Sequence, residues 1–201
     1  MIELAKKLAR TLFGEYAAYA IYSRSTNDTP QSHSGVAAAF TVAQVGTREI
    51  SDSKEQLVRE QAWYAGPDSI AYACFDGDRI VGVCFYWFGK RYQQRNFWPL
   101  VEGEAKLVQI VSIPAMRGHG VATTLIASSY RDMTQRGFGR AYARIWHSNT
   151  PSLRAFEKAG WTRVGFVLEL NPLRRPRPIR IRFDARSSRS HRAQSGALPL
   201  A

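Results

Sequence analysis

A strand, a glycine-rich turn and a helix follow one another without a linker between Glu104 and Arg136, and this run restricts the fold most. Residues 107–113 are rich in β-branched side chains and stop at Pro114, as a buried strand does. After the turn, small and apolar residues recur every four positions: Val121, Leu125, Ser129 and Met133. The pattern predicts a helix with one face in the core, directly after a buried strand.

The turn between this strand and this helix favours an anionic ligand. Gly118 and Gly120 let the backbone pass close to a ligand, and the first N–H groups of the helix have no partner inside it. These amides also lie at the positive end of the helix dipole. The spacing matches neither a Walker phosphate loop nor the three-glycine dinucleotide motif.

The turn resembles the acyl-CoA loop of the GCN5-related N-acetyltransferase (GNAT) family. The family pattern is Gln or Arg, two residues, Gly, one residue, then Gly or Ala, and it fits Arg117-Gly118-His119-Gly120-Val121-Ala122. A second block, Asn149–Trp161, is similar to the family's Asn-led helix, which ends in lysine, a small residue, glycine and an aromatic residue. The resemblance is good from about Ile70 to Leu170 and absent at both ends of the chain.

The remaining patterns agree with the α/β (α+β mixed) sheet that this resemblance implies. We expect a strand near 38–45, one or two short helices within 51–64, and a hairpin around Asp76-Gly77-Asp78. Residues 90–98 are expected to form a loop or a strand extension. A strand at 141–146 should be parallel to the strand before the crossover helix. A capped helix from Asn149 or Thr150 and strands at 162–170 and 179–183 complete the order.

The resemblance implies an acyl-CoA N-acyltransferase-like fold, with a central, mostly antiparallel sheet flanked by helices. Two central strands then splay apart, and the acyl-pantetheine arm of acetyl-CoA lies between them. The expected acetyl-CoA-binding residues are Ile110, Val111, Ser112, Arg117, Gly118, His119, Gly120, Val121, Ala122, Asn149, Ser152 and Phe156. No metal is expected.

Acetyl transfer to an amine needs a base, because a lysine-like amine has a pKa of about 10.4. Glu104 is the candidate, since it begins the strand that leads to the loop, and Glu102 is its neighbouring rival. Many family members carry a tyrosine acid where this chain has Phe156, which cannot donate a proton. Tyr130 and Tyr142 are alternative acids. A thiol with a pKa of about 8.5 can also leave unprotonated.

The resemblance therefore implies an acetyl-CoA-dependent transferase that acetylates a primary amine directly, within a ternary complex. The alternative is a protein of the same fold without catalysis, which binds acyl-CoA, nucleic acid or an anionic surface. The acceptor, a small molecule or a peptide, cannot be identified from these residues, and a homodimer is left open.

Both ends of the chain lie outside the resemblance. Residues 173–201 hold eight arginines and one aspartate, so they carry most of the net charge of +12. We expect three parts: a helix with Leu4, Leu8 and Leu12 on one face and then a linker (1–35), the acyltransferase domain (36–184), and a basic tail (185–201). The helix and tail could contact an anionic membrane or nucleic acid.

The sequence gives no sign of a membrane span or a secretory signal, so we expect a cytoplasmic protein, with peripheral membrane contact as an alternative. Cys74 and Cys84 lie in apolar, strand-like segments. They are expected to be small core residues in a reducing compartment rather than nucleophiles.

Overall fold

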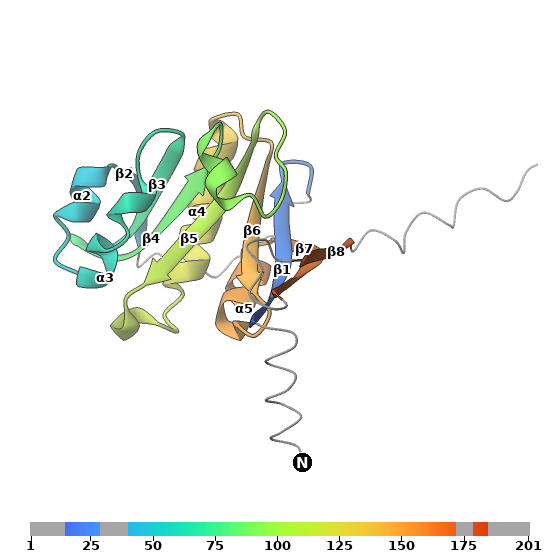
Figure 1. Ribbon diagram of the computed structural model, residues 1–201. Coiled ribbons are helices and arrows are strands. Elements are labelled where there is room, and N and C mark those ends of the chain that lie inside the picture. The colour runs from blue at the N-terminus through green and yellow to red at the C-terminus, as the bar shows by residue number, and fades with distance from the viewer. Residues whose placement is uncertain (1–14, 29–39, 172–178, 185–201) are drawn as a thin grey trace, which may run out of the picture. The chain divides into compact units, whose positions relative to one another are not determined.

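The computed structural model describes residues 15–28, 40–171 and 179–184. Their elements are β1 (Glu15–Ser25), β2 (Thr41–Val45), α2 (Thr47–Ser51), α3 (Gln56–Arg59), η1 (Ala62–Tyr64), β3 (Ser69–Asp76), β4 (Arg79–Trp87), η2 (Arg91–Arg95), β5 (Glu104–Ser112), η3 (Pro114–Met116), α4 (Val121–Gln135), β6 (Arg140–Trp146), α5 (Thr150–Lys158), β7 (Thr162–Asn171) and β8 (Ile179–Asp184), with η marking 3-10 helices (Figure 1).

Two compact units contain these elements. The larger unit runs from Tyr22 to Thr162, and the smaller contains the residues before and after that range. In the larger unit the strand order is β2-β3-β4-β5-β6, followed by the end of β1. The β2-β3, β3-β4 and β4-β5 pairs are antiparallel, whereas β5 and β6 are parallel, as expected for two strands joined by the crossover helix α4.

The core of the larger unit lies on both faces of β4. On one face Cys84 and Tyr86 contact Ser129 of α4, which crosses behind the sheet in Figure 1. On the other face the rings of Phe85 and Trp87 pack against Tyr64 of η1. Helices on both faces explain why β4 is a continuous apolar run without the alternation of a half-exposed strand.

Gly82 lets α4 begin directly on the sheet. A Cβ atom at this position would lie 2.9 Å from Val111 O and 2.9 Å from Val121 Cγ1. Only a glycine therefore allows the first turn of α4 to pack this closely over β4 and β5. This contact fixes where the amino end of α4 lies relative to the end of β5.

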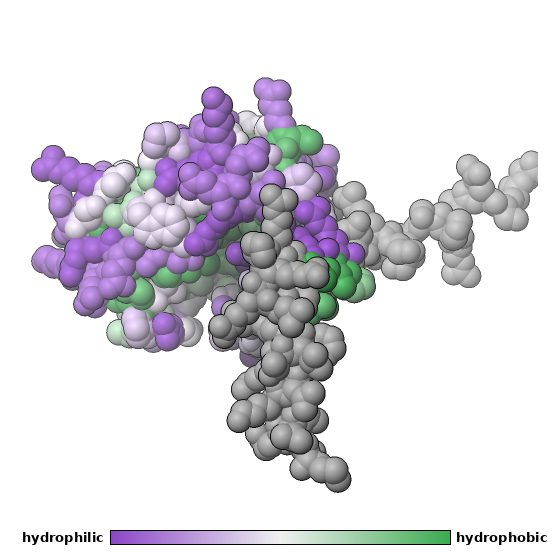
Figure 2. Space-filling view, in the orientation of Figure 1, coloured by the Kyte–Doolittle hydropathy of each residue, from purple (hydrophilic) through white to green (hydrophobic). Residues whose placement is uncertain are grey.

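The smaller unit contains the start of β1 with β7 and β8. β7 and β8 are antiparallel, with register pairs from Gly165↔Asp184 to Leu170↔Ile179. Alternate residues of β8 leave apolar side chains in solvent: Ile179 is 47%, Ile181 39% and Phe183 54% exposed. Figure 2 shows this hydrophobic cluster over β8. The predicted strand at 179–183 is confirmed.

The sequence prediction was wrong for the start of the chain. Residues 15–25, expected to belong to a helix and a linker, form the strand β1. The end of β1 pairs in the interior, and Ala18, Ala20, Ile21, Tyr22 and Ser23 are all buried. Burial on both faces removes the alternation by which a strand is recognised. The expected leucine face (4–12) and the arginine tail (185–201) lie outside the described residues.

The other expected elements are confirmed, with small shifts of their ends. The Asp76-Gly77-Asp78 hairpin joins β3 and β4, and Asn149 is the N-cap of α5. The predicted helices correspond to α3, α4 and α5, whereas α2 precedes the predicted range 51–64. Residues 90–98 form a loop containing η2, so the alternative of a strand extension is wrong.

Candidate active site

A cleft opens where β5 and β6 separate. The two strands pair from Glu104↔Arg140 to Leu107↔Ala143, and among the described residues no pair joins them beyond that point. In Figure 1 the strands diverge towards α5. The cleft has a volume of about 140 Å³ and is lined by Leu107, Val108, Gln109, Ile110, Ala143, Arg144, Ile145, Trp146, Asn149, Ser152 and Phe156.

An irregularity in β5 accompanies the separation. Phe85 pairs with Gln109 and Tyr86 with Leu107, so Val108 is an extra residue on β5. Such a bulge bends its strand and increases the local twist. The bulge directly follows the last pair with β6, which gives a physical reason for β5 to turn away there. Within residues 15–28, 40–171 and 179–184, the backbone of β5 beyond Leu107 thus has no partner strand on its β6 side.

Helix α5 closes one wall of the cleft. Asn149 accepts a hydrogen bond from the Ser152 amide at 3.3 Å and so caps the helix, while both side chains also line the cleft. Phe156 lines the cleft too, and its buried ring packs against Trp161 with centroids 5.1 Å apart. Asn149 therefore serves as a helix cap and as part of the cleft wall.

The glycine turn ends at the amino terminus of α4 with free amides. Gly118 and Gly120 have φ angles of +85° and +87°, and a Cβ atom on either would meet nothing within 4 Å. Within the described part of the chain, the amides of Val121 and Ala122 donate to no other residue, as is usual for a first helical turn. His119 is exposed, and its Nδ1 lies 3.1 Å from Arg117 O.

The structure brings together only some of the predicted site residues. Ile110, Asn149, Ser152 and Phe156 line the cleft, whereas Val111 and Ser112 follow on β5 outside its lining. The loop 117–122 lies beyond the end of β5. The sequence prediction did not include most residues of the cleft wall, among them Gln109, Arg144 and Trp146. These residues face the cleft only because β5 separates from β6.

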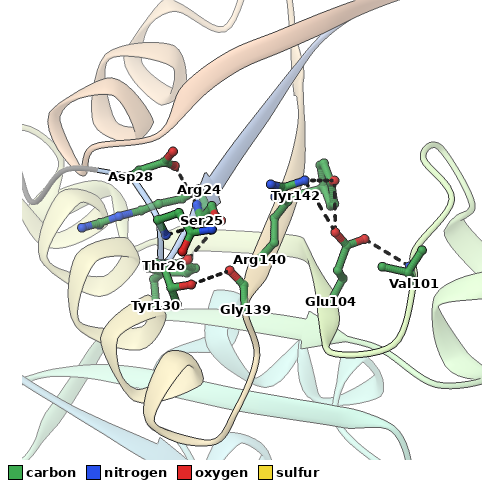
Figure 3. A network of polar contacts seen from close by, with 11 residues as sticks. Arg24, Ser25, Thr26, Asp28, Val101, Glu104, Tyr130, Gly139, Arg140 and Tyr142 are labelled. Carbon is green, nitrogen blue, oxygen red and sulfur yellow. Dashed lines mark hydrogen bonds and ion pairs between the residues drawn. The ribbon is translucent and has the colours of Figure 1, made fainter.

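Glu104 lies in a polar network at the other end of β5, where β5 and β6 are still paired. Its carboxylate accepts hydrogen bonds from the Tyr142 hydroxyl at 3.3 Å and from the Val101 amide at 3.1 Å. Arg140 Nη1 lies 3.9 Å from Glu104 Oε1, and the Glu104 side chain is 12% exposed. Figure 3 shows Arg140 and Tyr142 on one side of Glu104 and Val101 on the other.

Tyr142 belongs to this network and is its member nearest to the cleft along β6. It precedes Ala143, which is both the last residue of β6 paired with β5 and a residue of the cleft lining. Tyr130 lies elsewhere: its hydroxyl donates to Arg24 O at 3.0 Å, and burial raises its pKa to about 12. Of the two tyrosines considered as acids, Tyr142 is the one next to the cleft.

The two cysteines are core residues without nucleophilic character. Burial raises the pKa of the Cys74 thiol to about 11 and that of the Cys84 thiol to about 12. Both side chains are inaccessible to solvent, and Cys84 donates a hydrogen bond to Ser129 Oγ at 3.6 Å. Because the thiolate is the reactive form, neither residue is suited to carry an acyl group.

A hydrogen bond connects the cleft to the helical layer on the other face of β4. Gln109 lines the cleft, and its Nε2 donates to Gln61 Oε1 at 2.8 Å. Gln61 is buried and directly precedes η1. The segment 61–64 is therefore held against the cleft from the side of α2 and α3.

Among the described residues, no group of three or more His, Cys, Asp or Glu side chains gathers in a way that could hold a metal ion. No helix of the described part has the length and apolar character needed to cross a membrane.

Comparison with known proteins finds several similar acetyltransferases. A mycothiol acetyltransferase of Catenulispora acidiphila is 25% identical over 118 residues, which are 59% of this chain and 35% of that protein. The chain thus spans about a third of the length of this relative.

Two solved structures show the same fold. A GNAT-family acetyltransferase from Colwellia psychrerythraea has a TM-score of 0.54 at 12% identity, over 90% of this chain and 62% of that one. A putative GNAT-family acetyltransferase from Novosphingobium aromaticivorans has a TM-score of 0.53 at 14% identity, over 79% and 65% of the two chains.

The family profile described as "Acetyltransferase (GNAT) family" matches residues 37–161. This range contains the cleft between β5 and β6, the glycine turn and α5. Because the match covers more than half of the sequence, the chain belongs to the Acetyltransferase (GNAT) family.

Proposed function

We propose that the protein transfers an acetyl group from acetyl-CoA to a primary amine, directly and within a complex that holds both substrates. The observation that carries this proposal is the cleft between the separating strands β5 and β6, with α5 as its wall. Membership of an acetyltransferase family supports it independently.

The donor-binding residues fit the chemistry of acetyl-CoA. Open space above Gly118 and Gly120, free amides at the start of α4 and the exposed Arg117 suit a diphosphate. After Leu107 the main chain of β5, including Ile110 to Ser112, is paired only with β4, so its β6 side offers donors and acceptors to an amide-containing arm. Asn149, Ser152 and Phe156 would line the opposite side. The thioester of acetyl-CoA supplies the activated acetyl group.

Glu104 and Tyr142 would remove the proton from the amine. Leu107, at the closed end of the cleft, lies three positions beyond Glu104 on β5, a backbone distance of about 10 Å. Because of this spacing, Glu104 is proposed to receive the proton through a second group. In this proposal the Tyr142 hydroxyl, which is bonded to Glu104, passes the proton on, and Arg140 holds the carboxylate in place.

Direct transfer is favoured over a covalent acyl-enzyme by the state of the two cysteines. Both thiols are buried and their pKa values are raised to about 11 and 12, so neither forms a thiolate at neutral pH. Initial velocities measured against both substrates test this step. Intersecting lines in double-reciprocal plots support a ternary complex, and parallel lines contradict it.

A second function, acyl-CoA binding without transfer, is favoured by one observation. Phe156 offers no proton to a departing thiolate, although it lines the cleft. Two measurements separate the functions: calorimetry with acetyl-CoA, and thiol release with a panel of primary amines, followed by mass spectrometry of the products. Binding together with acetylated amine supports the transferase. Binding without turnover of any amine supports the second function.

A further inference from the structure

Arg95 lies on a platform of three aromatic rings. Its guanidinium carbon is 5.0 Å from the ring centre of Tyr64, 5.5 Å from that of Trp63 and 6.0 Å from that of Trp87. The rings also pack on one another, with 3.8 Å between the centres of Trp63 and Tyr64. Stacking holds a guanidinium by its face and leaves its N–H groups free at the edge.

Those N–H groups have no protein partner. Across the described ranges, the Arg95 side chain forms no hydrogen bond and no ion pair; its carbonyl accepts one from the Phe97 amide. Arg91, four residues earlier, differs: it also stacks on Trp87, but it donates to Trp63 O at 2.7 Å and to Pro67 O at 3.2 Å. Arg91 thus links η2 to η1 and to the loop after it. The N–H groups of Arg95, by contrast, remain available to bind a ligand.

The platform lies beside the closed end of the cleft. Trp87 on β4 pairs with Lys106 on β5, and the next residue, Leu107, is the first of the cleft lining. A second connection runs through Gln109, which lines the cleft and is hydrogen-bonded to Gln61, just before η1. The strand register and the hydrogen bond between Gln109 and Gln61 therefore place the platform on which Arg95 stacks beside the closed end of the cleft.

We infer that Arg95 and Trp63 form an acceptor subsite for amines that also carry an anionic group, a carboxylate or a phosphate. The inference rests on the proposed acetyl transfer. A guanidinium with free N–H groups binds such anions through paired, charge-assisted hydrogen bonds. Trp63, which is 55% exposed, offers a flat apolar surface to the part of the acceptor between the anion and the amine.

The test compares ω-amino carboxylates of increasing chain length with the alkylamines that lack the carboxylate. Aminoalkyl phosphates form a third series, which distinguishes the two sources of anion. Binding is measured by calorimetry in the presence of CoA, and turnover as kcat/KM with acetyl-CoA. The variants are Arg95→Gln, Arg95→Lys and, as a matched control, Lys90→Gln, which removes an exposed positive charge from the same loop.

At the best chain length, we expect the wild type to prefer the anionic acceptor by about tenfold or more, the value of a hydrogen-bonded charged contact. Arg95→Gln should lose this preference, Arg95→Lys should keep part of it, and Lys90→Gln should change it less than about twofold. Circular dichroism checks that each variant is folded.

The outcomes separate this inference from the proposed function. Turnover of alkylamines and anionic amines at equal kcat/KM overturns the subsite and leaves acetyl transfer standing. A preference that survives in Arg95→Gln also overturns it. Binding of anionic amines that depends on Arg95, without any turnover, supports the subsite and contradicts the transferase.

Discussion

The Tyr142 hydroxyl on β6 donates a hydrogen bond to Glu104 Oε1 on β5 at 3.3 Å, within the paired part of the two strands. This contact joins the candidate base to the edge of the cleft. It makes the two side chains one functional unit in the proposed mechanism, so their substitutions should not have additive effects.

We expect Glu104→Gln to lower kcat about 100-fold at pH 7, with partial recovery at high pH, where free amine is abundant. Tyr142→Phe keeps the ring contact with Trp98 but removes the hydroxyl, and should lower kcat about tenfold. Adding Tyr142→Phe to Glu104→Gln should have little further effect. The pH–rate profiles of the three variants check this. Additive losses, or a profile unchanged by Glu104→Gln, would remove the pair from the mechanism.

Gly120 allows a charge test of the donor site with a matched control. Its φ angle of +87° strains any other residue, and Asp and Asn share this strain and have similar size. Only Gly120→Asp brings a negative charge to the free amides of α4. We therefore expect Gly120→Asp to weaken acetyl-CoA binding at least tenfold more than Gly120→Asn. Equal affinities of the two variants in calorimetry would place the diphosphate elsewhere.

Gly82→Ala should destabilise the larger unit by about 1–3 kcal/mol, because the new methyl group meets the backbone oxygen of Val111 at 2.9 Å. Gly139→Ala is the control: its φ is not positive and a Cβ atom there meets nothing within 4 Å. We expect this variant to stay within about 0.5 kcal/mol of the wild type. Urea unfolding measures both changes. A stable Gly82→Ala would show that α4 is not held this tightly.

Because its two thiols are buried, we expect the free energy of unfolding of the protein to fall at alkaline pH. Their pKa values rise from 9.0 to about 11 for Cys74 and about 12 for Cys84, in both cases chiefly through burial. Above pH 9 the unfolded chain releases thiol protons that the folded chain keeps. Each thiol then lowers the free energy of unfolding by up to about 1.4 kcal/mol per pH unit.

The stability contributed by the protonated thiols is thus present below pH 9 and lost as pH rises towards the folded-state values. Urea unfolding between pH 7 and 10.5 measures the slope. Replacing both cysteines by alanine lowers stability at every pH through the cavities, but should flatten the slope above pH 9. An unchanged slope would show that other groups cause it; Tyr130, whose pKa burial raises to about 12, is one candidate.

Local signals were sufficient for the part of the fold that carries the proposed donor site. Pro114 ends a β-branched run, Gly118 and Gly120 have the positive φ angles that a glycine turn suggests, and Asn149 caps α5. Each of these features depends on residues within a few positions of one another. Sequence patterns report such short-range effects well.

The remaining features depend on residues far apart in the chain. The neighbours of β1 in the sheet, β6 and β7, are more than 100 residues away in the chain. No nearby residue therefore indicated a strand, and the helix predicted from Leu4, Leu8 and Leu12 was extended into it. Likewise, two other contacts form only once the sheet is assembled: the hydrogen bond between Gln61 and Gln109, and the stacking of Arg95 on Trp63. No local pattern could have identified these contacts.

The partners of the end of β1 also determine when the larger unit can finish folding. Tyr22 donates a hydrogen bond to Glu157, Arg24 to the carbonyl of Ala159, and the Thr26 amide to that of Gly139. Closing such long loops costs entropy and slows folding. During synthesis, the end of β1 leaves the ribosome early but has none of these partners until residues 139–159 have followed. A growing chain therefore presents β1 as an unpaired strand until residues 139–159 have been made, and an unpaired strand edge is prone to non-native association.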